Sequence, residues 1–331
     1  MPHPSIPTLK TPSVTKRAPW QDPHEIRISN WLTEWDFASP LDAGLIGAPY
    51  SSASITPSGA AGGPEAVRMG FRYNVTFSPD WDTDIQKMTV RDLGDISGHL
   101  TNVEKAHQNI EDAIAGALGL GQPFVPITIG GDHSITAPAI RGFAKANPGK
   151  KIGVINFDGH FDIRSFEHGN HNGTPFRQIL EREPKIDPAN FVEIGIHGFM
   201  NASYYYKELL DQGSRIVTGR EVQQRGMEAC VTEALELAGK GTDLIYVSVD
   251  IDCLAYPYTI GTSAATPEGL SAWQLLEGMW LCGQHPKVAA LDVVEIDPSR
   301  DVKDLTARTG CSVILTFLAG LYRRTYGNKG Y

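Results

Sequence analysis

Residues 151–162 read KIGVINFDGHFD, an apolar run that passes directly into a group of polar residues. The apolar part lacks the alternation of a half-exposed strand, so it predicts a strand buried on both faces. Such strands occur in parallel sheets covered by helices, and ligand sites lie at the carboxyl ends of those sheets. Asp158, His160 and Asp162 stand at this end of the predicted strand.

Further apolar runs of the same kind predict the rest of the sheet, at 43–48, 125–129, 191–196, 244–249 and 288–296. Stretches with helical spacing lie between them, at 102–117, 134–146, 221–238 and 271–282. This alternation predicts a single-domain, three-layer α/β/α fold with a mostly parallel sheet over residues 41–331. Residues 1–40 are rich in Pro, Trp, Ser and Thr and are predicted to form an irregular N-terminal arm on the surface or on a neighbour.

The composition restricts the class of protein. The chain has 331 residues, of which 41% are hydrophobic, and its formal net charge of −9 argues against binding to nucleic acid. No apolar run approaches the roughly 18 residues of a membrane span. The 4 cysteines are far apart and form no CxxC motif, which predicts a reducing compartment rather than a disulfide framework. We therefore expect a soluble cytoplasmic protein that binds neither nucleic acid nor membrane.

Three of the predicted strands end in residues that commonly bind metal ions. The segment GGDHS follows the predicted strand at 125–129, the segment DGHFD follows 151–157, and the segment Asp-Ile-Asp follows 244–249. Alternate residues of an extended chain point to the same side, so we expect the polar residues of each segment to converge. Together the segments supply four carboxylates and two imidazoles: His133, Asp158, His160, Asp162, Asp250 and Asp252.

The charge of this set decides its interpretation. Four carboxylates gathered without a cation would repel one another, at a cost of several kcal/mol. Two divalent cations cancel that charge, and the mixed oxygen and nitrogen donors favour Mn²⁺, with Ni, Co or Zn as competitors. Taken singly, GGDHS is also typical of a helix cap through Asp132 or Ser134, and Asp-Ile-Asp of a solvated turn. Their joint occurrence at strand ends favours a two-metal site, which makes hydroxide available near neutral pH.

The three segments, in this order and spacing, resemble those of the ureohydrolase (arginase/agmatinase) family. The resemblance runs from about residue 43 to residue 321 and includes GAPY at 47–50 and GGPEAVR at 62–68. It implies an arginase-like α/β fold, a binuclear manganese site, and hydrolysis of a C–N bond in an amidine or guanidine. It also implies a homo-oligomer, because family members are commonly trimers or hexamers.

The resemblance further assigns roles to the ligand-type residues. It implies that one ion is held by His133, Asp158, Asp162 and Asp250, and the other by Asp158, His160, Asp250 and Asp252. It suggests that Asp162 is also catalytic, by hydrogen-bonding the bridging hydroxide and helping to carry a proton to the departing amine.

Substrate specificity is expected to come from the loop at 163–177, where NGTPFR at 172–177 is similar to the formimidoylglutamase branch. Arginases usually carry asparagine at the position of Arg164. A guanidinium there pairs bidentately with carboxylates, so it predicts a strongly anionic substrate, while a salt bridge to Glu167 or to a neighbouring subunit is the structural alternative. Asn170 and Asn172 are further candidates for substrate contacts.

Other positions bear on the chemistry less directly. His171 lies one residue from the usual proton-shuttle position of the family, so it is a candidate shuttle. Arg177 is predicted to be structural. Gln274 stands where guanidine-cleaving members usually hold glutamate, and its neutral amide weakens the guanidine interpretation while leaving it a candidate for substrate binding.

The leading hypothesis is an enzyme that hydrolyses N-formimidoyl-L-glutamate to L-glutamate and formamide, a step in histidine degradation, with two Mn²⁺. The alternative is a guanidino-acid or guanidine hydrolase that releases urea, such as a guanidinobutyrase, guanidinopropionase or agmatinase-like enzyme. A second alternative is a non-catalytic subunit of the same family, whose usual sign would be lost metal ligands. The sequence retains all six ligand positions.

Overall fold

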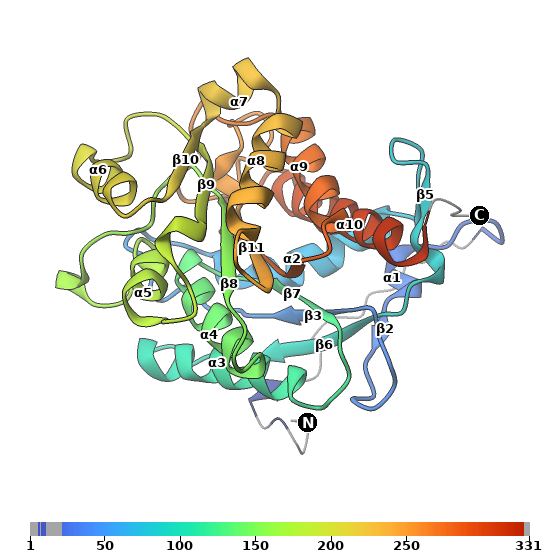
Figure 1. Cartoon of the computed structure of the whole chain (residues 1–331). Coiled ribbons are helices and arrows are strands. Elements are labelled where there is room, and N and C mark those ends of the chain that lie inside the picture. Colours follow the sequence, from blue (N-terminus) through green and yellow to red (C-terminus); the bar gives the residue numbers. More distant parts are fainter. Residues whose placement is uncertain (1–5, 7, 11–21, 328–331) are drawn as a thin grey trace.

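The computed structural model describes residue 6, residues 8–10 and residues 22–327 (Figure 1). Within this part of the chain, one 10-stranded sheet has the order β1-β6-β3-β7-β12-β11-β8-β9-β10, and β2 also pairs with β6. The pairings are parallel except that of β1 with β6. The strands are β1 (Leu9–Lys10), β2 (Thr33–Glu34), β3 (Ala43–Gly47), β6 (Val90–Ile96), β7 (Val125–Ile129), β8 (Ile152–Phe157), β9 (Phe191–Ile196), β10 (Arg215–Thr218), β11 (Leu244–Asp250) and β12 (Val288–Val294).

The central strands are buried on both faces, which confirms the interpretation of their unalternating apolar runs. Every residue of β3, β7, β8 and β9 is buried. The covering elements lie so close that Gly153, within β8, has no room for a side chain: a Cβ there would lie 2.0 Å from the carbonyl oxygen of Ala238 in a covering helix. A mostly parallel sheet enclosed in this way is the predicted fold.

Helices cover both faces of the sheet and complete the three layers. Figure 1 shows the strands between α3 and α4 on one side and α9 and α10 on the other. The first core cluster includes residues of α2 (Gly63–Gly70), α7 (Gly219–Arg225), α8 (Met227–Gly239), α9 (Ala272–Gln284) and α10 (Leu305–Tyr326). The second includes residues of α3 (Val103–Leu118), α4 (Thr136–Ala146), α5 (Pro175–Arg182) and α6 (Ser203–Asp211).

Two segments differ from the sequence prediction. The helix expected at 221–238 is split, because Gly226 adopts a left-handed φ of 82° that separates α7 from α8. The N-terminal arm is less irregular than expected, since β1 and β2 join the sheet and Ile28–Trp31 forms the short helix α1. Residues 1–5, 7 and 11–21 of that arm lie outside the described residues.

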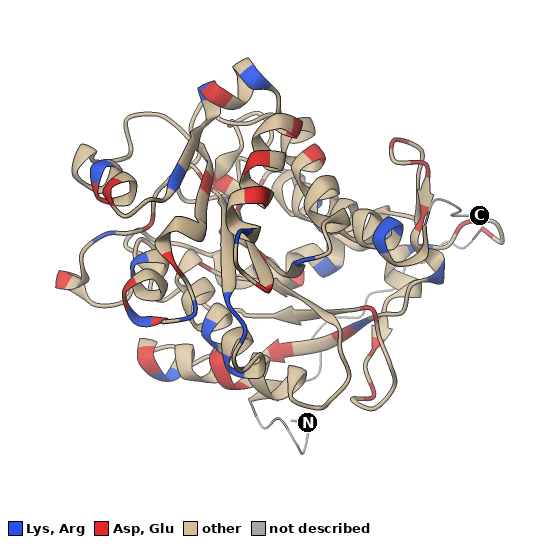
Figure 2. Cartoon of the chain, in the orientation of Figure 1, with Lys and Arg blue, Asp and Glu red and all other residues tan. Residues whose placement is uncertain are grey.

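Helix α10 is long and apolar enough to cross a membrane by length and composition alone. However, 72% of its most apolar window is buried inside the molecule, which is typical of a core helix. The charged residues form no single field in the view of Figure 2, where Lys and Arg are interspersed with Asp and Glu. A small hairpin of β4 (Phe77–Ser78) and β5 (Thr83–Asp84) lies apart from the main sheet.

Candidate metal centre and substrate cavity

Three strands within a set of four neighbours bring the ligand-type residues together at the carboxyl edge of the sheet. The strands β7, β12, β11 and β8 are neighbours in that order. His133 follows β7, Asp250 ends β11, and Asp158 follows β8. The parallel direction of these strands therefore gathers residues that are more than a hundred positions apart in the sequence.

The convergence does not arise from extended-chain alternation, and the sequence argument for it was wrong in this respect. The chain bends at Gly159 and His160, and Asp162 has a left-handed φ of 48°. After β11, residues Ile251–Cys253 form a 3-10 turn, with the Asp252 N–H donating to Asp250 at 2.9 Å. Tight turns, rather than a period of two, aim these carboxylates inward.

The first group of potential ligands surrounds the imidazole of His133. Its Nδ1 lies 3.2 Å from an oxygen of Asp158, 3.0 Å from Asp162 and 3.2 Å from Asp250. All four residues offer atoms within 4.8 Å of one another, which is the geometry of a site that could hold one metal ion. This set is the one that the family resemblance implies.

A hydrogen-bond relay fixes the tautomer of His133. The Ser248 hydroxyl lies 2.6 Å from Oδ1 of Asp292 and donates its proton there, so it accepts from His133 Nε2 at 3.1 Å. In the neutral ring the lone pair is therefore on Nδ1, which is buried and faces the three carboxylates. Burial alone would lower the pKa of His133, but Asp158, Asp162 and Asp250 outweigh it and raise that pKa well above its ordinary value. A bound cation would take the place of the Nδ1 proton, and an orienting partner on the other ring nitrogen is typical of metal-ligating histidines.

The second group contains Asp158, His160 and Asp252. The His160 Nδ1 atom lies 3.1 Å from an oxygen of Asp252 and 3.6 Å from Asp158. Asp158 therefore belongs to both groups, as expected for a shared ligand. Asp250, which the resemblance also implies for the second ion, is brought together only with the first group.

Among the described side chains, the cations within this site are its own imidazoles, those of His133 and His160, set against four carboxylates. Burial raises the pKa of Asp250 well above its ordinary value, and the neighbouring carboxylates of Asp252 and Asp158 raise it further. Burial alone would lower the pKa of His160, but the carboxylates of Asp252 and Asp158 outweigh it and raise that pKa. The polypeptide alone leaves too much buried negative charge, which divalent cations would compensate.

A second buried pair supports Asp158 from behind. The side-chain amide of Asn156 donates to Asp158 at 3.1 Å and to Glu193 at 2.8 Å. Burial raises the pKa of Glu193 well above its ordinary value, and Asp158 adds to the shift. Neither Glu193 nor the Ser248–Asp292 pair was identified from the sequence, because each lies within an apolar strand and only its neighbours in space reveal it.

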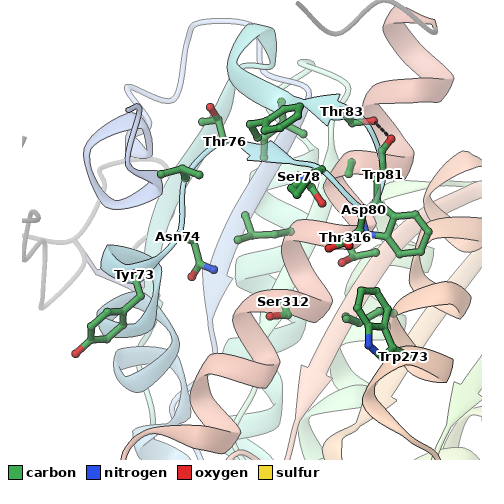
Figure 3. A pocket seen from close by; sticks show the side chains of 17 residues that line it. Tyr73, Asn74, Thr76, Ser78, Asp80, Trp81, Thr83, Trp273, Ser312 and Thr316 are labelled. Carbon is green, nitrogen blue, oxygen red and sulfur yellow. Dashed lines mark hydrogen bonds between the residues drawn. The ribbon is translucent and has the colours of Figure 1, made fainter. Parts of the chain in front are cut away.

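The two ligand groups open into a cavity of about 130 Å³. Its lining is Ile55, Thr56, His160, Asp162, Arg164, Asn172, Gly173, Asp250, Asp252, Ser263, Ala264 and Glu295. A larger cavity of about 300 Å³ lies between the β4–β5 hairpin and helices α9 and α10 (Figure 3). Among the described residues that line the larger one, Asp80 carries the only carboxylate, so the ligand chemistry lies in the smaller cavity.

Arg164 lies at this cavity, as predicted, and its side chain is exposed. Among the described residues its guanidinium forms no ion pair, so the salt bridge to Glu167 is not observed. Its side chain passes over Gly173, where a Cβ would lie 2.6 Å from Cδ of Arg164. The guanidinium is thereby available to an anion.

Glu295 was not identified as a candidate, although it follows β12 just as the other polar residues follow their strands. It lines the cavity, only 2% of its surface is exposed, and burial raises its pKa to about 8, with Asp132 adding to the shift. Glu295 has a left-handed φ of 62°, and the sequence pattern does not predict this conformation. Without a partner this buried carboxyl favours its neutral form, and a cationic group of a substrate beside it would favour the ionised form.

The remaining predicted residues lie differently. Asn172 lines the cavity and donates to Ser54 and Glu295, whereas His171 and Asn170 are not among the lining residues. The Gly173 N–H donates to Nδ1 of His171, which leaves the proton of the neutral ring on Nε2. Gln274 caps helix α9, where its Oε1 accepts from the Ser271 N–H at 2.8 Å, so its amide is engaged outside the cavity.

Comparisons with known proteins agree with this geometry. The model of the arginase family matches residues 41–320. The chain is 37% identical, over 94% of its length and 97% of the relative's, to a formimidoylglutamase of Halalkalibacterium halodurans. The crystal structure of Bacillus subtilis formimidoylglutamase superposes with a TM-score of 0.87 at 32% identity, covering 93% of this chain and 95% of that one.

A relative with bound metal shares the same architecture. The crystal structure of Trypanosoma cruzi formiminoglutamase with Mn²⁺ has a TM-score of 0.81 and 27% identity, and covers 91% of this chain and 99% of that one. The family match spans most of the chain, and it includes the three strand ends that carry the candidate ligands. The chain belongs to the arginase family.

Proposed function

We propose that this protein is a two-manganese hydrolase that converts N-formimidoyl-L-glutamate and water into L-glutamate and formamide. Water oxygen adds to the formimidoyl carbon, the bond from that carbon to the glutamate nitrogen breaks, and the nitrogen leaves as an amine after gaining a proton. The observation that carries the proposal is one cavity that combines the two ligand groups with the guanidinium of Arg164, which forms no ion pair in the part of the chain that the structure describes. The similarity to formimidoylglutamases over nearly the whole chain supports it.

The ligand groups define where the ions would be held. His133, Asp158, Asp162 and Asp250 would hold one Mn²⁺, and Asp158, His160 and Asp252 the other, with Asp250 as a further ligand of the second. When bound, the ions lower the pKa of water towards neutrality and polarise the amidine. Ni, Co or Zn would compete for the same oxygen and nitrogen donors.

The side chains around the ions would orient the substrate. The Glu295 carboxylate faces the cavity and would pair with the cationic amidine. Arg164 would bind substrate carboxylates through its fork of N–H donors, which suits a substrate with two carboxylates better than one with a cationic tail. Asn172, whose side-chain amide donates to Glu295 and Ser54, would complete the polar lining, whereas Asn170 lies outside it and would contact only a part of the substrate that extends beyond the cavity.

Proton transfer would be carried out by Asp162 and His171. Asp162 lines the cavity and would accept the proton of the attacking water and pass it to the departing amine. Burial, together with the charges of Arg164 and His168, lowers the pKa of His171, so its ring is neutral at physiological pH. His171 would relay the proton towards solvent by accepting it at Nδ1, in place of the hydrogen bond from the Gly173 N–H.

The protein's wider context is also a proposal. We infer a homo-oligomer, a trimer or hexamer, because large apolar side chains such as Phe199, Tyr204 and Trp273 are exposed on the single chain. We infer a cytoplasmic enzyme of a small-molecule pathway that binds neither nucleic acid nor membrane. Light scattering coupled to size-exclusion chromatography measures the oligomer, and a monomer would contradict this part.

The main test is the product formed by the Mn²⁺-reconstituted protein. The expected result is formamide and glutamate from N-formimidoyl-L-glutamate, with little urea from guanidinobutyrate, guanidinopropionate, agmatine, arginine or guanidine. Urea from a guanidino acid would favour the alternative hydrolase, since Arg164 and Glu295 would also suit such a substrate. No bound metal after reconstitution would favour a non-catalytic subunit.

A further inference from the structure

Arg177 links the substrate loop to a helix on the other side of that loop. It lies in α5, and its Nε donates to the backbone carbonyls of Ile163 at 2.8 Å and Arg164 at 2.9 Å. These carbonyls belong to the residues directly after Asp162. One side chain therefore binds the backbone between a candidate metal ligand and the candidate substrate-binding arginine.

The guanidinium is itself held in place from the other side. Its terminal nitrogens form a bidentate pair with Glu208 of α6, at 2.9 and 2.6 Å, and one also donates to Glu181 at 2.6 Å. Only 12% of the Arg177 side chain is exposed. The hydrogen bonds that Arg177 donates to Glu208, and then that to Glu181, raise the pKa of Arg177, so it is charged at all relevant pH values.

Helix α6 makes a second contact with the same segment. The hydroxyl of Tyr205 accepts a hydrogen bond from the Ser165 N–H at 3.2 Å, and the Arg177 guanidinium lies 5.7 Å from the Tyr205 ring. On the other side, the Arg164 N–H donates to the Gly173 carbonyl at 2.8 Å. Residues 163–165 are thus fixed by α6, α5 and the far end of the loop.

This segment needs such support because its backbone is strained. Asp162 adopts a φ of 48°, which is unfavourable for a residue other than glycine and persists only when the surroundings hold it. We propose that Arg177, anchored by Glu208, is a positioning residue that sets substrate specificity by holding the turn from which the Arg164 side chain reaches the cavity. This inference rests on the proposed function for the substrate, but the positioning itself does not depend on it.

The test combines two measurements on the Mn²⁺-loaded protein. In Arg177→Gln, backbone amides of residues 161–170 are expected to exchange with D₂O about tenfold faster than in the wild type. The dissociation constant for L-glutamate is expected to rise about tenfold, because Arg164 is no longer held towards the anion. Arg177→Lys retains the charge but not the fork, so both values are expected to be intermediate.

Arg215 supplies a matched control. It also binds two carboxylates, of Glu221 and Glu233, and donates to a backbone carbonyl, that of Ile216, but in β10. Arg215→Gln is expected to leave the exchange of 161–170 and the affinity for L-glutamate as in the wild type.

The outcomes separate the two proposals. The positioning role would be overturned if the amides of 161–170 exchanged at the same rate in Arg177→Gln as in Arg215→Gln. It would also be overturned if the wild type bound L-glutamate and Arg177→Gln bound it equally well. A wild type that neither binds L-glutamate nor turns over N-formimidoyl-L-glutamate would overturn the proposed function. The exchange result then decides the positioning role alone.

Discussion

Asn172 and His133 donate hydrogen bonds to the same oxygen atom, Oε1 of Glu295. The Asn172 side-chain amide lies 3.1 Å from it and the His133 backbone N–H 3.0 Å, while Ser263 donates to Oε2 at 3.3 Å. One carboxylate at the end of β12 therefore connects the GGDHS turn after β7 to the substrate loop after β8. The turn that carries the candidate ligand His133 and the loop that carries Asn172 are therefore held in place by the same side chain.

Glu295→Gln should impair catalysis without releasing the metal. Glutamine retains an oxygen acceptor for His133 but removes the charge that would pair with an amidinium. We expect kcat/KM for N-formimidoyl-L-glutamate to fall about 10- to 100-fold, the range for a lost hydrogen bond to a charged group. Ser263→Ala, which removes a hydrogen bond and keeps the charge, is the matched control. A variant with normal kcat/KM would show that Glu295 does not meet the substrate cation.

Arg164→Ala should mainly raise KM for an anionic substrate. Because the guanidinium has no ion-pair partner among the described residues, its removal leaves no buried charge unpaired. We expect KM for N-formimidoyl-L-glutamate to rise about 10- to 100-fold, with kcat changed less. Turnover of formamidine, which has no carboxylate, should be unaffected.

Gly173→Ala tests the same contact without touching the guanidinium. A Cβ at Gly173 would lie 2.6 Å from Cδ of Arg164, so the side chain must move away. We expect a rise in KM in the same direction as for Arg164→Ala. An unchanged KM in both variants would assign Arg164 a purely structural role.

Much of the fold follows from the sequence because its signals are local. Unalternating apolar runs located six strands of the sheet correctly, and their polar ends located the six candidate ligands. Strand β6 was not predicted, since its run of seven residues contains Arg91, Asp92 and Asp95. Asp92 is buried there only because Arg68 of α2 pairs with it at 2.7 Å, and a tertiary ion pair leaves no local pattern.

The site shows the same division between local and tertiary signals. Residue types and strand ends gave the ligand set, but the backbone that aims it depends on left-handed turns at Asp162 and Glu295. Aspartate tolerates that conformation better than most residues, but the local sequence around neither residue predicts it. Gln274 was expected at the substrate because of a family position, whereas the Ser271–Gln274 capping box is a sequence signal that accounts for it.

Asp250→Ala should remove both metal and activity. Its carboxylate lies 3.2 Å from His133 Nδ1 within the first ligand group, so its loss takes one of four donors from that site. We expect Mn²⁺ content measured by mass spectrometry to fall and hydrolysis to drop below detection. Asp243→Ala, an exposed carboxylate just before β11, is the control and should keep both. Full Mn²⁺ content in Asp250→Ala would contradict the ligand assignment.

Buried acids near the cavity should make the metal-free protein sensitive to pH. Burial raises the pKa of Glu295 to about 8, and burial raises that of Asp132 to about 6. Asp158 shifts in the opposite direction, because the adjacent imidazoles of His133 and His160 outweigh its burial and lower its pKa. The raised pKa values mean that between about pH 4 and pH 8 the folded state binds more protons at these acids than the unfolded state.

The sign of the effect follows from this proton difference. Stability changes with pH in proportion to the protons bound by the unfolded state minus those bound by the folded state, which is negative here. The free energy of unfolding of the metal-free protein should therefore fall as pH rises from about 4 to 8, by about 1.4 kcal/mol per pH unit for each extra proton. Saturating Mn²⁺ would bind the ionised ligand carboxylates, such as Asp250, and would supply positive charge near Glu295 and Asp132, so it should remove much of this loss. The increase in Tm on adding Mn²⁺ to EDTA-treated protein is thus expected to be larger at pH 8 than at pH 5.5, and Glu295→Gln should make the metal-free decline shallower. If the increase in Tm were equal at both pH values, these carboxyls would ionise without help from a cation. That result would contradict the effect assigned to their burial.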